Sequence, residues 1–431
     1  MKWPKRSWKW LARTAGVLML VLSSAASAQL GGLGLPGGLP GGGIVQGLPG
    51  SVNRTTDQLG RTIDTTVDTV KHDVVGRPIL SRAIDRDPLG ARIVRGELLA
   101  VSPSDAGLAA ARALHFDIVR RDTLGGLGLE AVVLEVPDGM SASEALAALK
   151  KADPQGSYDY DHLYDPSGDG MGGGGAETAT PDARAIRIGM IDGGVAVHHP
   201  AFAAVKIVTK NIAASRESPP TEHGTAVASL LVGEDGDFHG YLPHATLYAA
   251  DAFGGNPAGG AADDIVRALD WLATNRVAVV NVSLAGPPNA LLEAGVKAFL
   301  ARGHILVAAV GNAGPAAPIA YPAGYRGVVA VTSVDARHRL QIDANRGSVM
   351  FAARGVDVRA AATRGYAAVT GTSFAAPVVA ARLAWLIPEP DVRGAGQAVL
   401  TLEHAARPLG NADSATGYGY LDPPQSAQGL K

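Results

Sequence analysis

Five short apolar runs, rich in β-branched residues, alternate with helical patterns over residues 186–334. Each run is apolar almost throughout, which is typical of strands in a parallel sheet that is covered on both faces. The strand-like runs are residues 186–191, 246–250, 277–283, 305–310 and 328–334, and the helical patterns are residues 224–232, 261–274 and 291–301. The sequence therefore predicts an α/β domain over residues 185–425, mainly a parallel sheet with helices on both faces.

A different pattern precedes this domain. Residues 94–101, 116–121, 129–136 and 158–164 favour strands, and residues 104–114 and 141–151 favour helices. Ser104 is a plausible N-cap of the first helix, and Ser141 with Glu144 forms a capping box at the second. The order β-α-β-β-α-β predicts a small α+β, ferredoxin-like domain over residues 94–165.

The first 28 residues have the pattern of a secretory signal peptide. A basic start is followed by the apolar run 15–22 and the small-residue cleavage signal Ala26-Ser27-Ala28. This run is too short for an ordinary membrane span, and an uncleaved anchor is the alternative. We therefore expect an exported protein, secreted or periplasmic, with no membrane partner after signal removal.

The remaining segments join or flank these parts. Residues 29–50 form a Gly/Leu/Pro-rich segment that we expect to be flexible, residues 166–184 a Gly-rich linker and residues 426–431 a tail. In the region 51–93, which we interpret as a helical linker region, apolar residues recur three and four positions apart between Leu59 and Val74.

Charge and cysteine content exclude several functions. The formal net charge is -2, which gives no support to a nucleic-acid partner. The chain has no cysteine, so disulfides, thiolate catalysis and Cys-based zinc sites are excluded.

Polar residues with catalytic chemistry stand at the boundaries of the predicted elements. Asp192 follows a strand, His223 begins a helical pattern, Asn312 follows another strand and Ser373 precedes the apolar run from Pro377 to Leu386. Ligands of such sheets bind beyond the carboxyl ends of the strands. Taken singly, each residue is also explained as a turn residue or a helix cap.

Taken together, these residues resemble the active site of the subtilisin-like serine peptidases (subtilases), which carry Asp, His and Ser in this chain order. The matching stretches cover roughly residues 185–422: IGMIDGGVAVHHPAF, EHGTAVASLLVG, VVNVSLAGP, VAAVGNAGP, TGTSFAAPVVAARLA and GYGYLDP. Departures include Ala226, where the family usually has histidine, and Phe374, where it usually has methionine. No departure removes a group that transfers a proton or holds an oxyanion.

The resemblance implies a serine endopeptidase in which Ser373 is the nucleophile, His223 the base, Asp192 its orienting carboxylate and Asn312 an oxyanion donor. It also implies that polypeptide substrates pair with the strand edge Ser283, Leu284, Ala285 and Gly286. Together with Ala308, Ala309 and Gly311, this edge would form the pocket for the residue before the cut. Small apolar walls favour a large apolar side chain there.

The same resemblance implies that residues 94–165 are a propeptide that inhibits the enzyme until the chain is cut within about residues 165–184. The implied chemistry needs no cofactor. Calcium is common in the family, but the sequence has no recognisable ligand loop.

Three alternatives stay open at this point. A secreted pseudopeptidase would bind peptides without cleaving them. A dinucleotide-binding enzyme is opposed by GMIDGGV, which lacks the G-x-G-x-x-G spacing. A structural, surface-attached protein depends on the Gly-rich N-terminal segment alone.

Overall fold

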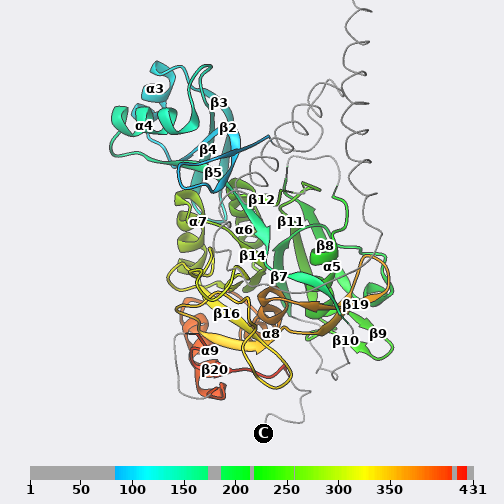
Figure 1. The fold of residues 1–431 in the computed structure, drawn as a ribbon. Coiled ribbons are helices and arrows are strands. Elements are labelled where there is room, and N and C mark those ends of the chain that lie inside the picture. Colours follow the sequence, from blue (N-terminus) through cyan, green and yellow to red (C-terminus); the bar gives the residue numbers. More distant parts are fainter. Residues whose placement is uncertain (1–82, 173–185, 214–217, 257, 410–414, 425–431) are drawn as a thin grey trace, which may run out of the picture. The chain divides into compact units, whose positions relative to one another are not determined.

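The computed structural model describes residues 83–172, 186–213, 218–256, 258–409 and 415–424 (Figure 1). The signal peptide 1–28, the segment 29–50, most of the region 51–93 and the tail 426–431 lie outside the described residues, and so does most of the linker 166–184. Among the described residues, no helix combines the length and the apolar character that crossing a membrane requires.

An eight-stranded sheet forms the centre of the C-terminal domain, which begins at about residue 186. Its strand order is β20-β17-β16-β15-β13-β7-β11-β8, and every neighbouring pair is parallel. The strands are β7 (Arg187–Asp192), β8 (Lys206–Asn211), β11 (Thr246–Asp251), β13 (Val279–Val282), β15 (Ile305–Ala309), β16 (Val329–Val334), β17 (Phe351–Arg354) and β20 (Gly419–Tyr420). The predicted parallel sheet is confirmed. Strands β8, β17 and β20 were not predicted.

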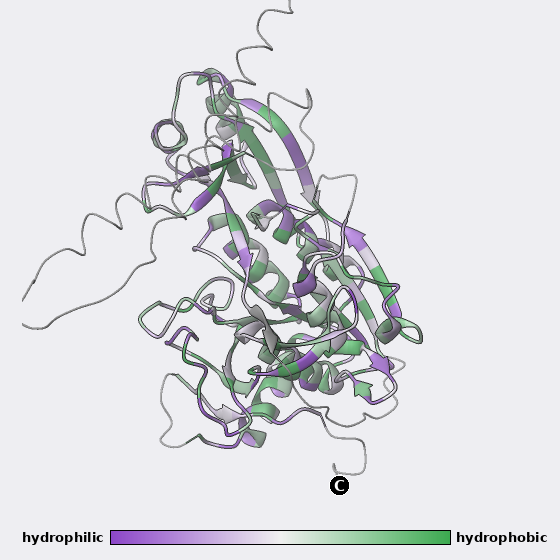
Figure 2. Ribbon diagram, turned by 45° about the vertical axis from the view of Figure 1, so that its right-hand side comes forward, coloured by the Kyte–Doolittle hydropathy of each residue, from purple (hydrophilic) through white to green (hydrophobic). Residues whose placement is uncertain are grey.

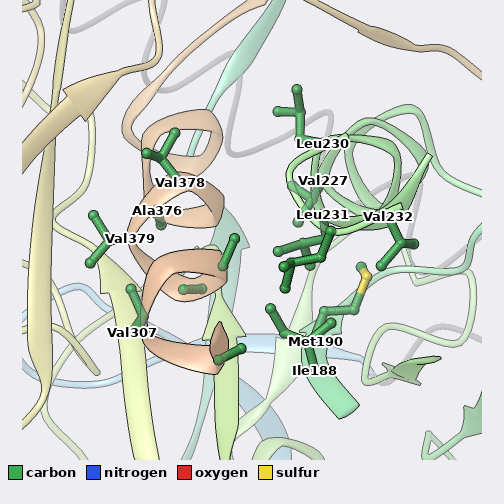
Figure 3. Close-up of a cluster of buried hydrophobic side chains, with 14 of the residues drawn as sticks. Ile188, Met190, Val227, Leu230, Leu231, Val232, Val307, Ala376, Val378 and Val379 are labelled. Carbon is green, nitrogen blue, oxygen red and sulfur yellow. The ribbon is translucent and has the colours of Figure 1, made fainter. Parts of the chain in front are cut away.

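Helices cover both faces of this sheet, as its apolar strands require. On one face, α5 (Glu222–Val232) and α8 (Thr372–Leu386) pack on Ile188, Met190 and Val307 (Figure 3). On the other face, α6 (Ala262–Thr274) and α7 (Ala290–Ala301) pack on Ile191 and Leu306. Hydrophobic and hydrophilic residues both occur along the helices and strands of the chain (Figure 2). Residues 224–232 of α5 and most residues of α8 are buried, so these two helices are enclosed on nearly all sides.

Several further elements complete the C-terminal domain. They are η1 (Pro200–Phe202), β9 (Glu234–Asp235), β10 (Phe238–His239), β12 (Gly260–Ala261), β14 (Leu284–Ala285), β18 (Val358–Ala361), β19 (Tyr366–Thr370) and α9 (Val392–Ala405). Of these, α9 extends the core through Ala398 and Leu402, which join the cluster beneath α5 and α8.

The N-terminal domain has the predicted β-α-β-β-α-β order. Its elements are β2 (Arg92–Val101), α3 (Asp105–Ala113), β3 (Asp117–Leu124), β4 (Leu129–Glu135), α4 (Ala142–Ala152) and β5 (Ser157–Pro166), and the strand order is β5-β2-β4-β3. Ser104 caps α3 and Ser141 closes a capping box with Glu144, as the sequence predicts. Before β2, β1 (Ile84–Arg86) is a strand, so the helical interpretation of 51–93 is wrong there. The reason is that β1 pairs with β2 in an antiparallel ladder.

The sheet of this domain is buried on both faces. Leu98 and Ala100 pack with α3 and α4, whereas Leu99 and Val133, which point the other way, share a core cluster with residues of α6 and α7. A polar contact also joins the two domains. Asp159 Oδ2, on β5, accepts from the N–H of Ala290 at the start of α7, at 2.8 Å. The two domains are therefore held together by a common apolar core and by caps on helix ends.

The chain beyond the N-terminal domain differs from the predicted linker. The end of β5 pairs with β12 on one side and with β14 on the other, both antiparallel. After two residues, β6 (Asp169–Gly172) pairs with β19. Residues 166–172 were predicted as linker from their glycine content, but pairing with β14 and β19 of the C-terminal domain satisfies backbone groups of this segment.

His304 gives the fold a pH dependence. Its ring stacks on Phe299 with centroids 4.2 Å apart, and its Nδ1 lies 2.7 Å from the carbonyl oxygen of Val277. Burial lowers the pKa of His304 below its ordinary value of 6.5. The stability that neutral His304 contributes is therefore fully present above pH 6.5 and is lost as the pH falls toward the folded-state pKa.

We expect His304→Asn to show a smaller loss of Tm between pH 8 and pH 5 than its parent. Thermal denaturation at the two pH values measures this difference. His115→Asn is the matched control, because His115 is exposed. An equal loss of Tm in His304→Asn and its parent would contradict the prediction.

Candidate active site

Asp192 is the last residue of β7 and has no exposed surface. Its Oδ1 accepts from the N–H of Gly193 at 2.8 Å. A carboxylate at the carboxyl end of a central parallel strand lies where ligands of such sheets bind. The backbone hydrogen bond fixes the direction in which the carboxylate points.

His223 lies in the first turn of α5, whose N-cap is Thr221. Its Nδ1 is 2.9 Å from Asp192 Oδ1. An ionised carboxylate only accepts hydrogen bonds, so Nδ1 carries the hydrogen and, in the neutral ring, Nε2 keeps its lone pair. Within the described residues, Nε2 is buried and has no hydrogen-bond partner. The ring is therefore oriented as a base with its accepting nitrogen free.

Ser373 is the second residue of α8, which Gly371 begins without a side-chain cap. Ser373 is thus not a helix cap, the plainer explanation that its sequence allowed. Its hydroxyl donates to the carbonyl oxygens of Ser167 and Ser283. The next residue, Phe374, has its ring centroid 5.4 Å from that of His223, so the start of α8 adjoins the imidazole.

Asn312 follows β15 and faces the start of α8. Its Oδ1 accepts from the N–H of Thr372 and from Gln341 Nε2, both at 3.1 Å. Its Nδ2 is buried and, among the described residues, has no partner. A Cβ placed on Gly371 would lie 3.4 Å from this Nδ2 and 3.0 Å from the carbonyl oxygen of Ser167. The amide nitrogen and that carbonyl oxygen therefore border the same glycine, although no hydrogen bond joins them among the described residues.

Pro377 changes which group donates a hydrogen bond to the carbonyl oxygen of Ser373. A proline at this position lacks the N–H that would otherwise bond to Ser373 O within the helix. The hydroxyl of Ser283 donates to that oxygen instead, at 2.9 Å. The end of β13 and the start of α8 are thereby joined at Ser373.

The chain's own residues 163–168 lie across this group. The N–H of Ser167 donates to Ser283 O, and the N–H of Ser373 donates to Ser167 O, each at 3.0 Å. Pro166 and Asp165 pair with Leu284 and Ala285 of β14. A peptide bond, Ser167–Gly168, is thus held at the Ser373 hydroxyl by backbone hydrogen bonds.

The predicted substrate edge meets this segment. Leu284 and Ala285 form the ladder, and Gly286 leaves room for the ring of Tyr164, whose Cδ1 would lie 2.3 Å from a Cβ there. Gly311, which was also predicted to bind substrate, lies beside the start of α8. Its N–H donates to Thr372 Oγ1, and Asn345 fills the space that a side chain at this position would take. Gly311 supports the Asn312 loop, whereas the other residues of the set contact the bound segment.

The sequence analysis missed Gln341, which orients Asn312, and the placement of residues 164–168. Asp165-Pro166-Ser167-Gly168 contains only ordinary turn residues, and no local pattern indicates a binding partner. Among the described residues, no group of three or more His, Cys, Asp or Glu side chains is arranged to hold a metal ion.

The structure joins Asp192 to His223 and places Phe374, the neighbour of Ser373, against the His223 ring, whereas no hydrogen bond joins His223 Nε2 to Ser373 among the described residues. An aspartate, a histidine and a serine on a parallel α/β fold are typical of serine hydrolases. The comparisons specify the family: the profile of the subtilase family (Peptidase_S8) matches residues 183–420. The chain belongs to the subtilase family and is a serine-type endopeptidase that acts on polypeptides.

Two relatives and one solved structure support the assignment to the subtilase family. Subtilisin DY of Bacillus licheniformis is 32% identical over 239 residues, which are 53% of this chain and 85% of that protein. Subtilisin BL of Lederbergia lenta is 36% identical over 163 residues, which are 37% of this chain and 60% of that protein. Fervidolysin from Fervidobacterium pennivorans, a keratinolytic enzyme, matches in fold with a TM-score of 0.67 at 19% identity, over 80% of this chain and 62% of its own.

Proposed function

We propose that the protein is an exported serine endopeptidase that is made as an inhibited precursor and cuts its own chain at Ser167–Gly168. One observation carries this proposal: the Ser167 carbonyl oxygen accepts hydrogen bonds from the N–H and the hydroxyl of Ser373. The bond from the Ser373 N–H is the kind of contact that an oxyanion hole makes with the carbonyl oxygen, and it places the Ser373 hydroxyl beside the carbonyl group that it would attack.

In the proposed reaction, Ser373 Oγ attacks the substrate carbonyl carbon and its proton passes to His223 Nε2. Asp192 keeps the ring in the required tautomer and stabilises its charged form. Asn312 Nδ2 and the Ser373 N–H hold the oxyanion. The protonated ring then gives its proton to the leaving amine, and water repeats the sequence on the acyl-enzyme. No cofactor takes part in these steps.

Substrates would bind in the same way as the chain's own residues 163–168. Backbone pairing with β12 and β14 binds any extended peptide, and pockets for side chains add specificity. Tyr164, four residues before the cut, is fully buried and donates to the carbonyl oxygen of Pro287 at 2.7 Å. Burial raises the pKa of Tyr164 well above its ordinary value of 10.0, so its hydroxyl stays a neutral donor. The residue at the cut is the small Ser167, whereas the sequence predicted a large apolar side chain there.

Inhibition of the precursor follows from the same contacts. Residues 94–167 form a domain that packs on α6 and α7 and fills the substrate strand position. After the bond is cut, the Ser167 carboxylate stays where the substrate carbonyl binds. The N-terminal domain would therefore act as a product inhibitor until it is released or degraded.

We expect purified wild-type protein to contain a chain that begins at Gly168, because this bond is the one presented to Ser373. Intact-mass measurement and N-terminal sequencing test this, with Ser373→Ala as the uncut reference. A first cut outside residues 166–169, or equal processing of Ser373→Ala, would contradict the proposal.

A pseudopeptidase that binds peptides without cleaving them is the competing function. A serine-directed fluorophosphonate probe separates the two, because only an activated serine reacts with it. We expect labelling of the processed wild type and none of Ser373→Ala. Export, secreted or periplasmic, depends on the sequence of residues 1–28, and cell fractionation tests it.

A further inference from the structure

We propose that Phe374 restricts the residue after the cleaved bond to glycine, so that the substrates are proteins with glycine after the cut in an extended segment. This inference rests on the proposed function. A Cβ added to Gly168 would lie 2.7 Å from Cε2, 3.2 Å from Cζ and 3.5 Å from Cδ2 of Phe374. Carbon atoms in ordinary contact are about 3.5–4.0 Å apart, so even alanine collides with this ring.

The ring of Phe374 has little freedom to move. It is 2% exposed and belongs to the core cluster beneath α5 and α8. One side of it adjoins the imidazole of His223, which is tied to Asp192. Because interiors are close-packed, turning the ring away would displace either the core or the proposed base.

The backbone of the bound segment is equally constrained. Ser167 is hydrogen-bonded at both its N–H and its carbonyl oxygen. On the far side of the cut, β6 pairs with β19. A Cβ on Gly371 would lie only 2.6 Å from Gly168 Cα, so the two backbones are already in close approach. Gly168 is therefore confined between Gly371 and Phe374, and a larger residue cannot shift without misaligning the carbonyl.

The side chain at position 374 decides whether a residue larger than glycine can follow the cleaved bond. The subtilases that the sequence resembles usually carry methionine after the serine. A methionine side chain is unbranched and flexible, so it can withdraw from a substrate side chain, whereas a buried aromatic ring is rigid. A misplacement of about 1 Å at the reacting atoms can cost about 10² in rate. That factor is the selectivity we expect between glycine and alanine.

The test uses fluorogenic peptides with the sequence of residues 163–172, LYDPSGDGMG, in which the position of Gly168 is glycine, alanine or valine. For processed wild type, we expect kcat/KM to be about 10² lower for alanine than for glycine, and lower again for valine. Phe374→Ala and Phe374→Met should reduce the glycine-to-alanine ratio to below about 10, whatever their absolute rates. Wild type that cleaves the alanine and glycine peptides equally would overturn the inference while the proposed function stands.

A second experiment does not depend on added peptides. In the precursor, Gly168→Ala should slow self-cleavage by about 10², and adding Phe374→Ala should restore part of the rate. The matched control is Gly396→Ala, because a Cβ at Gly396 in α9 meets nothing within 4 Å. Gly168→Ala processed as fast as Gly396→Ala would overturn the inference. If wild type cuts neither its own chain nor any peptide, the proposed function fails and this inference fails with it.

Discussion

Ser373→Ala is expected to abolish peptide-bond hydrolysis and to leave the chain as an uncut precursor. Loss of the nucleophile should lower kcat by about 10⁶, the order found for subtilisin itself. The fold should remain, because the Ser373 hydroxyl contributes contacts only to the bound segment and to Ser283 O. Casein digestion with mass spectrometry of the new termini measures the activity, and circular dichroism checks the fold.

Ser333→Ala is the matched control for this prediction. Ser333 is as fully buried as Ser373 but lies within β16. Its variant should process itself and digest casein at close to the wild-type rate. Ser373→Ala that digests casein like Ser333→Ala would show that Ser373 is not the nucleophile.

Asn312→Ala is expected to leave a slow enzyme, with kcat lower by about 10²–10³, the loss known for removal of an oxyanion-hole asparagine from subtilisin. The physical reason is that Nδ2 has no partner among the described residues and borders the same glycine, Gly371, as the Ser167 carbonyl, so it can donate to an oxyanion formed there. In the transition state this carbonyl oxygen gains charge, so a hydrogen bond to it is worth more there than in the ground state. The loss should therefore appear in kcat rather than in KM.

Asn312→Asp separates this role from a structural one. The aspartate keeps an acceptor for the N–H of Thr372 and for Gln341 Nε2, but it has no amide donor. We expect it to be at least as slow as Asn312→Ala, because its charge also repels the oxyanion. An Asn312→Asp enzyme with near wild-type kcat would assign Asn312 to loop support alone.

The N-terminal domain shows which features can be predicted locally. The capping box at Ser141 and the cap at Ser104 were readable because each motif lies within four residues of sequence. The alternation of Leu98 and Leu99 between two cores follows from the strand period. The identity of the second core was not predictable, because it depends on α6 and α7, more than 150 residues further along the chain.

The sequence by itself determined the parallel α/β class and placed Asp192, His223, Asn312 and Ser373 at element boundaries, because periodicity and turn chemistry act over short windows. Only the tertiary structure decided what these residues face. The Ser373–Ser167 contact spans 206 positions, and neither the binding of residues 164–168 nor the collision between Gly168 and Phe374 has a local signal. Such contacts are selected by the packing of whole elements, so they exist only once the chain has folded.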